Sequence, residues 1–457
     1  MSLFNRKISE TINDSSNQEQ GFSSYNNPFI DELVEHYKNR LLNESNLDQI
    51  TNLSRAEMRS AIERVVTQFM QEEKVVIPRS DKEKLLTKLI DESVGFGPLE
   101  ALLNDADITE ILINGHDEVY IEKKGRLELT NMKFRDEAHV RHIIDRVVAP
   151  LGRRIDESSP MVDARLHDGS RVNAVIPPVS LKGTLVSIRK FRKDPLTMEE
   201  LIKLESLNEE MSIFLQAIVT AKMNIIISGG TGSGKTTLLN GVARSIPFNE
   251  RVITIEDSAE LRLNRPNVVG MEARPANVEG SGEITIRQLV KNSLRMRPDR
   301  IIVGEVRGPE AFDMLQAMNT GHEGSLTTVH ANSPRDALGR VEGMVIMSGM
   351  DLPTSVIREY IVGAIDFIVQ GERLTDGKRK IVSISELVTN SEGKVQINEI
   401  FKYKKTGMGS SGEVKGHFTP TGIIPECLER LKIFGLDIDE EMFKPVGGQL
   451  HDYSRSI

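Results

Sequence analysis

A glycine-rich segment that ends in a lysine and a threonine is the strongest chemical signal in the sequence. Residues 224–241 read NIIISGGTGSGKTTLLNG, and residues 229–236 fit the pattern G-x-x-x-x-G-K-[ST] between two apolar runs. Glycines let the backbone curl so that successive N–H groups point inward at phosphate oxygens, and the helix expected next adds its free N–H groups. The segment therefore predicts a nucleotide phosphate site rather than a structural turn.

Each position of this loop has an expected role with ATP and Mg²⁺. Lys235 is expected to place its charge on the β and γ phosphates, and the Thr236 hydroxyl can ligate Mg²⁺. The sequence contains neither the Asn-Lys-x-Asp segment of guanine-binding proteins nor the Leu-Ser-Gly-Gly-Gln signature of transporter-type ATPases. The residues expected to wrap the phosphates are Gly230, Thr231, Gly232, Ser233, Gly234, Lys235, Thr236 and Thr237.

Acidic residues follow a second apolar run, in VITIEDSAELRL. Glu256, Asp257 and Glu260 stand at or just beyond the end of the strand expected there. A carboxylate in that position lies near the edge of the sheet where ligands bind in open α/β folds. Glu256 or Glu260 could orient the attacking water, and the alternative is a solvated acidic loop.

A third apolar run ends in a glycine and a glutamate, in RPDRIIVGEVRGPEAFDMLQA. Residues 301–303 lead into Gly304 and Glu305, and Arg307 follows. Ordinary P-loop enzymes carry a Mg²⁺-binding aspartate at this strand end. Glu305 could hold Mg²⁺ through water, activate the nucleophile, or do both, and the alternative is an exposed acid on a turn.

Two histidines flank a further strand, in TGHEGSLTTVHANS. His322 and His330 are not at the i,i+4 spacing of a helical metal pair, and no third ligand is evident. We therefore favour hydrogen bonding near the γ-phosphate, with His330 among the catalytic residues and His322 among the nucleotide-binding ones. A core histidine with its hydrogen bonds satisfied is the alternative.

The elements that must position these residues indicate several domains in a chain of 457 residues. Apolar residues recur at helical spacing near the N-terminus, and Asn114-Gly115 and Asp168-Gly169 then signal hairpins. The short apolar strands around the glycine-rich loop alternate with helical patterns, which predicts a parallel sheet wrapped by helices. We expect a disordered tail at 1–27, a helical bundle at 28–90, an α+β domain at 91–200, an α/β domain at 201–432 and a C-terminal tail at 433–457.

Composition and charge exclude or disfavour several classes of protein. The chain is 39% hydrophobic and 27% charged, as in soluble globular proteins, and it has no secretory signal and no apolar run of membrane-spanning length. A net charge of −9 argues against binding nucleic acid through the overall field. The basic stretch SIRKFRK has Phe191 as its one aromatic residue, so a nucleic-acid-binding module is disfavoured.

The four segments at 229–236, 256–260, 301–307 and 321–332 resemble the Walker A, Asp box, Walker B and His box of the type II/type IV secretion ATPase superfamily. GFGPLEALLNDADITEILINGHDEVYIEKKGRLE and DARLHDGSRVNAVIPPVS further resemble the tight-adherence (Flp) pilus assembly ATPases, the CpaF branch. The likeness runs from about residue 28 to the C-terminal tail. Cys427 is the single cysteine, so the four-cysteine zinc module of other branches cannot form.

This resemblance implies a RecA-like P-loop ATPase domain preceded by an α+β domain and a helical bundle. It implies a hexameric cytoplasmic motor at the inner face of the membrane, attached through partners, with ATP bound between two domains. Domain closure would drive an inner-membrane platform protein that adds or removes pilin subunits. Arg171 and Arg189 match arginines that approach the phosphates across the domain cleft, the alternative being surface arginines, and Arg165, Arg192 and Arg307 match less well.

Three other readings remain at this point. The first is a type IV secretion ATPase that drives transfer of DNA or effectors. The second is a nucleotide-dependent scaffold that does not hydrolyse ATP, which Lys235, Thr236 and Glu305 argue against. The third is a nucleic-acid-binding module formed by SIRKFRK and the N-terminal helices, which the lack of interleaved aromatic residues argues against. Within the leading interpretation, the sequence leaves open which of Glu305, Glu256 and Glu260 activates water.

Overall fold

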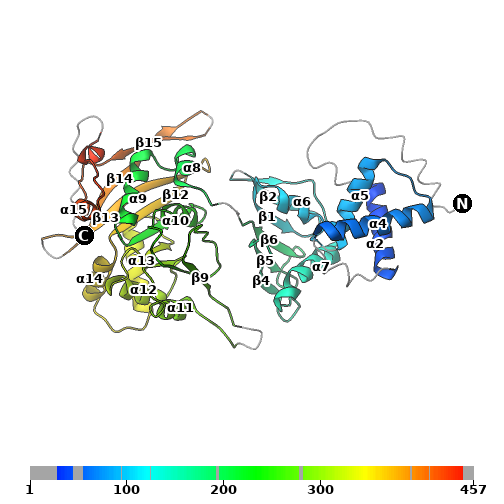
Figure 1. The fold of residues 1–457 in the computed structure, drawn as a ribbon, viewed down its shortest axis with the longest axis horizontal. Coiled ribbons are helices and arrows are strands. Elements are labelled where there is room, and N and C mark those ends of the chain that lie inside the picture. The colour runs from blue at the N-terminus through cyan, green and yellow to red at the C-terminus, as the bar shows by residue number, and fades with distance from the viewer. Residues whose placement is uncertain are drawn as a thin grey trace. The chain divides into compact units, whose positions relative to one another are not determined.

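The computed structural model describes residues 28–44, 55–93, 95–123, 125–191, 195–276, 281–391, 394–410 and 412–445. The tail expected at 1–27, Arg192 and the last part of the expected C-terminal tail lie outside these ranges. The described part of the chain forms two compact units, which divide between residues 191 and 192 (Figure 1). Each unit has its own hydrophobic cores and is described by itself.

Among the described residues, the first unit begins with three helices: α2 (Pro28–Glu44), α4 (Arg55–Glu73) and α5 (Arg79–Ser93). Their apolar residues recur every three or four positions and meet in one core. Tyr37 of α2 stacks on Phe69 of α4, with ring centroids 6.3 Å apart. The helical pattern that the sequence predicts in this region is therefore confirmed.

A six-stranded antiparallel sheet follows in the same unit, in the order β3-β2-β1-β6-β5-β4. Its hairpins carry Gly115 and Gly169 at φ 80° and 95°, left-handed values that favour glycine, so both predicted hairpins are confirmed. The connections, residues 115–118 and 166–170, are longer than a two-residue turn. The elements are α6 (Leu99–Asn104), β1 (Ile108–Asn114), β2 (Val119–Lys123), β3 (Arg126–Leu129), α7 (Glu137–Val148), η2 (Ala149–Leu151), β4 (Met161–Arg165), β5 (Arg171–Val175) and β6 (Leu185–Arg189).

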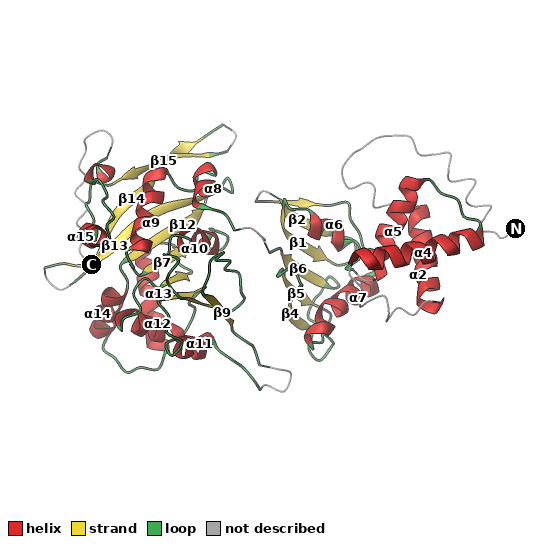
Figure 2. Cartoon of the chain, viewed as in Figure 1, coloured by secondary structure: helices red, strands yellow, loops and turns green. Residues whose placement is uncertain are grey.

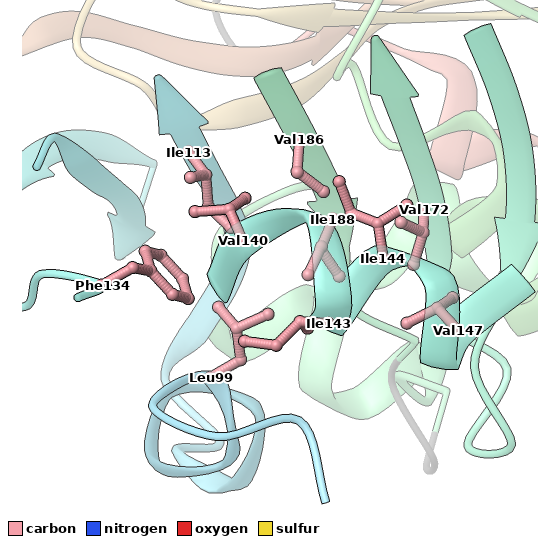
Figure 3. A pocket seen from close by; sticks show the side chains of 10 residues that line it. All are labelled: Leu99, Ile113, Phe134, Val140, Ile143, Ile144, Val147, Val172, Val186 and Ile188. Carbon is pink, nitrogen blue, oxygen red and sulfur yellow. The ribbon is translucent and has the colours of Figure 1, made fainter. Parts of the chain in front are cut away.

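Helix α7 covers one face of this sheet. Figure 3 shows its apolar side chains facing those of the neighbouring strands around a small cavity. The ten residues that line the cavity are all apolar, so it belongs to the core and offers nothing to a charged ligand. The alternate residues of β5 and β6 lie on the other, more exposed face, which carries Arg171 and Arg189.

The second unit is built on a nine-stranded sheet, in the order β15-β14-β13-β12-β7-β11-β10-β8-β9. Neighbours from β12 to β9 are parallel, and β12 to β15 are antiparallel. The strands are β7 (Ile225–Gly229), β8 (Val252–Glu256), β9 (Val268–Glu272), β10 (Arg300–Val303), β11 (Leu326–Val329), β12 (Phe367–Arg373), β13 (Arg379–Thr389), β14 (Val395–Met408) and β15 (Val414–Pro420).

Helices cover both faces of this sheet (Figure 2). One core includes α8 (Met198–Lys203), α9 (Glu209–Thr220), α10 (Lys235–Ala243) and α15 (Leu428–Ile433), and the short helix η3 (Glu440–Phe443) adds Phe443. The other core includes α11 (Ile286–Ser293), α12 (Glu310–Asn319), α13 (Pro334–Met347) and α14 (Thr354–Ala364).

Burial on both faces explains the unbroken apolar runs of the central strands. Every residue of β7, β8, β10 and β11 is buried, and these are the four strands that the sequence predicts. The arrangement is the predicted RecA-like α/β fold, preceded by helices and an α+β sheet. Across the described residues, no helix is both long enough and apolar enough to cross a bilayer.

Candidate active site

Most of the candidate nucleotide-binding and catalytic residues of the second unit lie at one edge of its sheet. Strands β7, β8, β10 and β11 are parallel, so their carboxyl ends meet there, with Ser228 opposite Val329 and Ile255 opposite Val303. The glycine-rich loop, the acidic segments and His330 each follow one of these strand ends. This edge is where open α/β sheets bind ligands.

The loop between β7 and α10 has the backbone expected of a phosphate loop. Gly232 and Gly234 have φ values of 70° and 92°, and Gly234 caps the N-terminus of α10. A Cβ atom on Gly229 would lie 2.6 Å from the carbonyl oxygen of Gly371 on β12, so no larger residue fits. The close approach of two strands therefore fixes the first glycine of the motif.

The loop carries donors that suit an anion. Lys235 Nζ donates to the carbonyl oxygens of Gly229 and Gly230, at 3.0 and 3.1 Å. The hydroxyl of Ser233 is buried and has no hydrogen-bond partner within the described part of the chain. A glycine-rich turn, a lysine and an unpaired hydroxyl at a helix N-terminus fit the phosphates of a nucleotide.

Glu256 ends β8 as a buried carboxylate. Its Oε2 accepts hydrogen bonds from the backbone N–H groups of Glu260 and Leu261, at 2.7 and 3.0 Å. Burial raises the pKa of Glu256 to about 7, with smaller contributions from the charges of Glu260 and Glu272, although the two hydrogen bonds act in the opposite direction. A carboxyl group in this pKa range can take up or release a proton near neutral pH.

Gly304 leaves the space that the Glu256 side chain occupies. A Cβ atom on Gly304 would lie 2.9 Å from Cγ of Glu256. Its own backbone is fixed on both sides, because its N–H donates to Ile255 and its carbonyl accepts from the Thr328 hydroxyl, both at 2.8 Å. The glycine at this strand end therefore has a packing reason.

Glu305 and Arg307 form an ion pair just beyond β10. Arg307 Nη2 lies 2.6 Å from Glu305 Oε2. This hydrogen bond raises the pKa of Arg307, and the nearby charges of Asp257 and Glu260 add to the effect. Arg307 thus stands among the acids of both segments, which brings the Asp box and Walker B carboxylates into one cluster.

Two residues that sequence reasoning missed support this cluster. Asn240 of α10 accepts a hydrogen bond from the N–H of Arg262 at 2.8 Å and donates to the carbonyl of Glu260 at 3.4 Å. Glu310, at the start of α12, accepts from the N–H groups of Arg307 and Gly308 at 2.8 and 2.9 Å. A buried amide within an apolar helix and an acid in a first helical turn are the signals that could have indicated them.

The structure separates the two histidines. His330 directly follows β11, at the same edge of the sheet as the phosphate loop. His322 precedes β11, so it lies toward the opposite edge of the sheet, where its carbonyl accepts from the Ser325 hydroxyl at 2.8 Å. Its buried Nδ1 has no hydrogen-bond partner within the described residues. The structure therefore does not bring His322 to the phosphate loop.

His322 and His330 lie at opposite ends of β11, so the structure does not bring them together as a pair of metal ligands. Among the residues that the structure describes, no three His, Cys, Asp or Glu side chains stand together as a metal site. Thr236, at the start of α10, and Glu305, after β10, follow parallel strands at the same sheet edge. A hydroxyl and a carboxylate are oxygen donors of the kind that Mg²⁺ prefers, so the donor set fits a nucleotide-bound Mg²⁺.

Arg171 and Arg189 are cross-strand neighbours in the first unit. They pair directly in the register of β5 and β6, and Arg165 of β4 pairs with Arg171. The three arginines therefore lie in a row across neighbouring strands, on the face that α7 leaves uncovered.

The segments described above lie within a region that matches the model of a known protein family. The family model for Type II/IV secretion system protein matches residues 92–406. The chain belongs to this family. The match begins just before the six-stranded sheet and ends within β14, so it includes the phosphate loop and both acidic segments.

The matches to several curated relatives span most of each relative's length. A Mycobacterium tuberculosis protein named "Putative conjugal transfer protein Rv3659c" is 38% identical over 317 residues, which cover 68% of this chain and 89% of that protein. The type IV secretion system protein VirB11 of Bartonella quintana is 34% identical over 347 residues, which cover 65% and 95%. The solved VirB11 ATPase of the Brucella suis type IV secretion system, in complex with sulphate, is 30% identical, with 63% and 94% covered and a TM-score of 0.34.

Proposed function

We propose that this secretion ATPase family member hydrolyses ATP to power assembly of a tight-adherence (Flp) pilus. The observation that carries the proposal is the phosphate loop with Lys235, at the same sheet edge as the carboxylates Glu256, Glu260 and Glu305. A loop of this kind binds nucleotide, and acidic side chains beside it can orient and activate the attacking water. The Flp-like segments of the first unit supply the choice of pilus.

Each residue of the edge has a role in this proposal. The N–H groups of residues 230–237 and the Lys235 ammonium bind the phosphates. Thr236 and Glu305, the latter through water, would hold Mg²⁺, which supplies positive charge to the β and γ phosphates when bound. Glu305 activates the water, with Glu256 and Glu260 as the other candidates, and His330 hydrogen-bonds near the γ-phosphate.

The proposal extends to the whole assembly, as the resemblance implies. The chain works as a homo-hexamer in the cytoplasm, at the inner face of the membrane, through platform proteins and without direct contact to nucleic acid. Arg171 and Arg189 add positive charge to the nucleotide phosphates, whereas His322 has a structural role. The division of the chain into five parts at residues 27, 90, 200 and 432 belongs to this proposal, with two bounds adjusted because α8 from Met198 and Phe443 of η3 both pack in the core of the second unit.

The decisive experiment is phosphate release from ATP by the purified full-length chain. We expect steady turnover by the wild type and loss of nearly all turnover in Lys235→Ala. Lys432→Ala removes an exposed lysine of α15 and serves as the control, with unchanged turnover. A wild type without turnover, or a Lys235→Ala variant with wild-type turnover, contradicts the proposed activity.

A second candidate is a type IV secretion ATPase. It is favoured by the relatives named for conjugal transfer and for VirB11, at 38% and 34% identity. Reconstitution of the chain with an Flp platform protein and with a type IV secretion channel, each in vesicles, separates the two. Stimulation of ATP turnover by the channel alone favours the second candidate.

A further inference from the structure

The turn between β12 and β13 brings two arginines beside the phosphate loop. Strand β12 is parallel to β7, with Gly371 opposite Gly229, so the turn leaves the sheet at the edge where the loop lies. Arg373 ends β12 and Arg379 begins β13, and the two are direct partners across the hairpin. None of the sequence motifs includes either residue.

Both side chains reach residues 232–234 of the phosphate loop, here called the crown of the loop. Arg379 Nε donates a hydrogen bond to the carbonyl oxygen of Gly232 at 2.9 Å. A Cβ atom on Gly232 would lie 3.4 Å from Arg373 Nη1, and one on Gly234 would lie 3.5 Å from Cδ of Arg379. The two arginine side chains therefore pack against the two loop glycines that have left-handed backbone angles.

The other side of the same strand is anchored. Lys380, which is 4% exposed, donates to the carbonyl of Glu205 and lies 3.3 Å from its Oε2. Its ammonium also lies 5.7 Å from the ring centroids of Tyr403 and Phe418. Arg379 thus projects from a strand whose next residue is fixed to the connection between α8 and α9.

A phosphate loop works when its N–H groups point inward and its carbonyl groups point outward. Gly232 is free to lose that orientation, because glycine populates both signs of φ. A charged donor on its carbonyl holds the peptide in the outward-facing orientation. Lys235 holds the carbonyls of Gly229 and Gly230 in the same way, but it must move to a bound phosphate, whereas Arg379 can stay.

We propose that Arg379 is a positioning residue, which holds the crown of the phosphate loop ready for a nucleoside diphosphate through the Gly232 carbonyl. Arg373 packs beside it, and the Lys380–Glu205 contact fixes the strand from which both act. This inference rests on the proposed function, since it concerns the same phosphate loop. It adds a contribution to nucleotide binding from a hairpin about 140 residues beyond the Walker A motif.

The test measures ADP binding by calorimetry with the full-length chain. We expect Arg379→Gln to raise the dissociation constant for ADP about tenfold, the size expected for losing one hydrogen bond to a charged group. Lys404→Gln removes one positive charge from neighbouring β14 and should stay within about twofold of wild type. Glu205→Gln, which weakens the anchor, should raise the constant about threefold.

Amide hydrogen exchange of the nucleotide-free chain provides the second measurement. Residues 230–234 should exchange faster in Arg379→Gln than in wild type or Lys404→Gln, while the melting temperature stays the same. Unchanged exchange at these residues, or ADP affinity within twofold of wild type in Arg379→Gln, overturns the inference. A wild type that binds no ADP contradicts the proposed function instead, so the two failures are distinguishable.

Discussion

Ionisation of the Glu256 carboxyl group destabilises the folded state. Its pKa, about 7 in the folded protein against 4.5 for a free glutamate, means that the folded state binds the proton more tightly than the unfolded state does. The resulting stability is complete below about pH 4.5 and is lost as the pH rises through 7. At neutral pH, therefore, the charged form is retained at a cost to stability, as is common for functional groups.

Replacing this carboxylate should change how stability depends on pH. We expect Glu256→Gln to gain stability over wild type as the pH rises from 4.5 to 8, by up to about 3 kcal/mol. The glutamine oxygen can still accept the two backbone hydrogen bonds. Denaturant unfolding at several pH values checks this, with Glu359→Gln, an exposed acid of α14, as the control. Parallel curves for wild type and Glu256→Gln would contradict the raised pKa.

Glu305 should affect turnover more than binding. We expect Glu305→Gln to keep its affinity for ATP and to lose at least about a hundredfold in turnover, the usual contribution of a positioned base. Single-turnover phosphate release and ATP binding, measured on the same preparation, separate the two effects. If the variant hydrolyses ATP at the wild-type rate, Glu256 or Glu260 activates the water.

Two glycines allow a matched test of packing. Gly304→Ala should lose about 1–3 kcal/mol of stability, because the new methyl group meets Cγ of Glu256 at 2.9 Å. Gly339→Ala, in the exposed part of α13 with no atom within 4 Å of the new Cβ, should gain up to about 1 kcal/mol. Chemical denaturation measures both, and equal effects of the two substitutions would show that Gly304 is not confined by its neighbour.

At the scale of elements, the central strands could be predicted from sequence, whereas the outer strands could not. β7, β8, β10 and β11 are buried on both faces, so each appears in the sequence as a short apolar run. β9 and β15 are mostly exposed or half-buried and carry no such run. β12 and β13 are largely buried, but polar residues interrupt their apolar positions, so the sequence does not predict them as strands. The hairpin that carries Arg373 and Arg379 therefore becomes visible only in the structure.

Strand direction explains which residues of the site could be predicted from the sequence to lie together. Lys235, Glu256, Glu305 and His330 follow the ends of parallel strands, so the motif order predicts that they lie at one edge. His322 belongs to the same sequence block as His330, yet a strand of about 3.3 Å per residue separates them. Asn240 and Glu310 act on backbone groups of distant segments, and only the folded chain shows those contacts.

Asn240 joins two elements, and its loss should loosen one of them. We expect Asn240→Ala to lower stability by about 1–3 kcal/mol, because the N–H of Arg262 and the carbonyl of Glu260 lose their partner. Amide exchange of residues 260–262 should rise as well. Asn292→Ala, in α11, is the control. Equal exchange in the two variants would show that this loop is held in another way.

At the scale of the whole molecule, ATP turnover should depend on both units. We expect Arg189→Ala, in the first unit, to lower turnover at least tenfold, since an arginine on a transferring phosphoryl group is worth far more than that in other ATPases. Arg126→Ala, an exposed arginine of β3 in the same sheet, should leave turnover unchanged. Wild-type turnover in both Arg171→Ala and Arg189→Ala would remove the first unit from the chemistry.

The close approach of Gly304 to Glu256 has a consequence for the history of the family. The glycine is required by a neighbouring side chain, so the requirement lasts only as long as that side chain does. A descendant that gave up the buried glutamate for a smaller residue could accept a side chain at position 304. We expect these two positions to change together among homologues, with glycine at one wherever a long acid stands at the other.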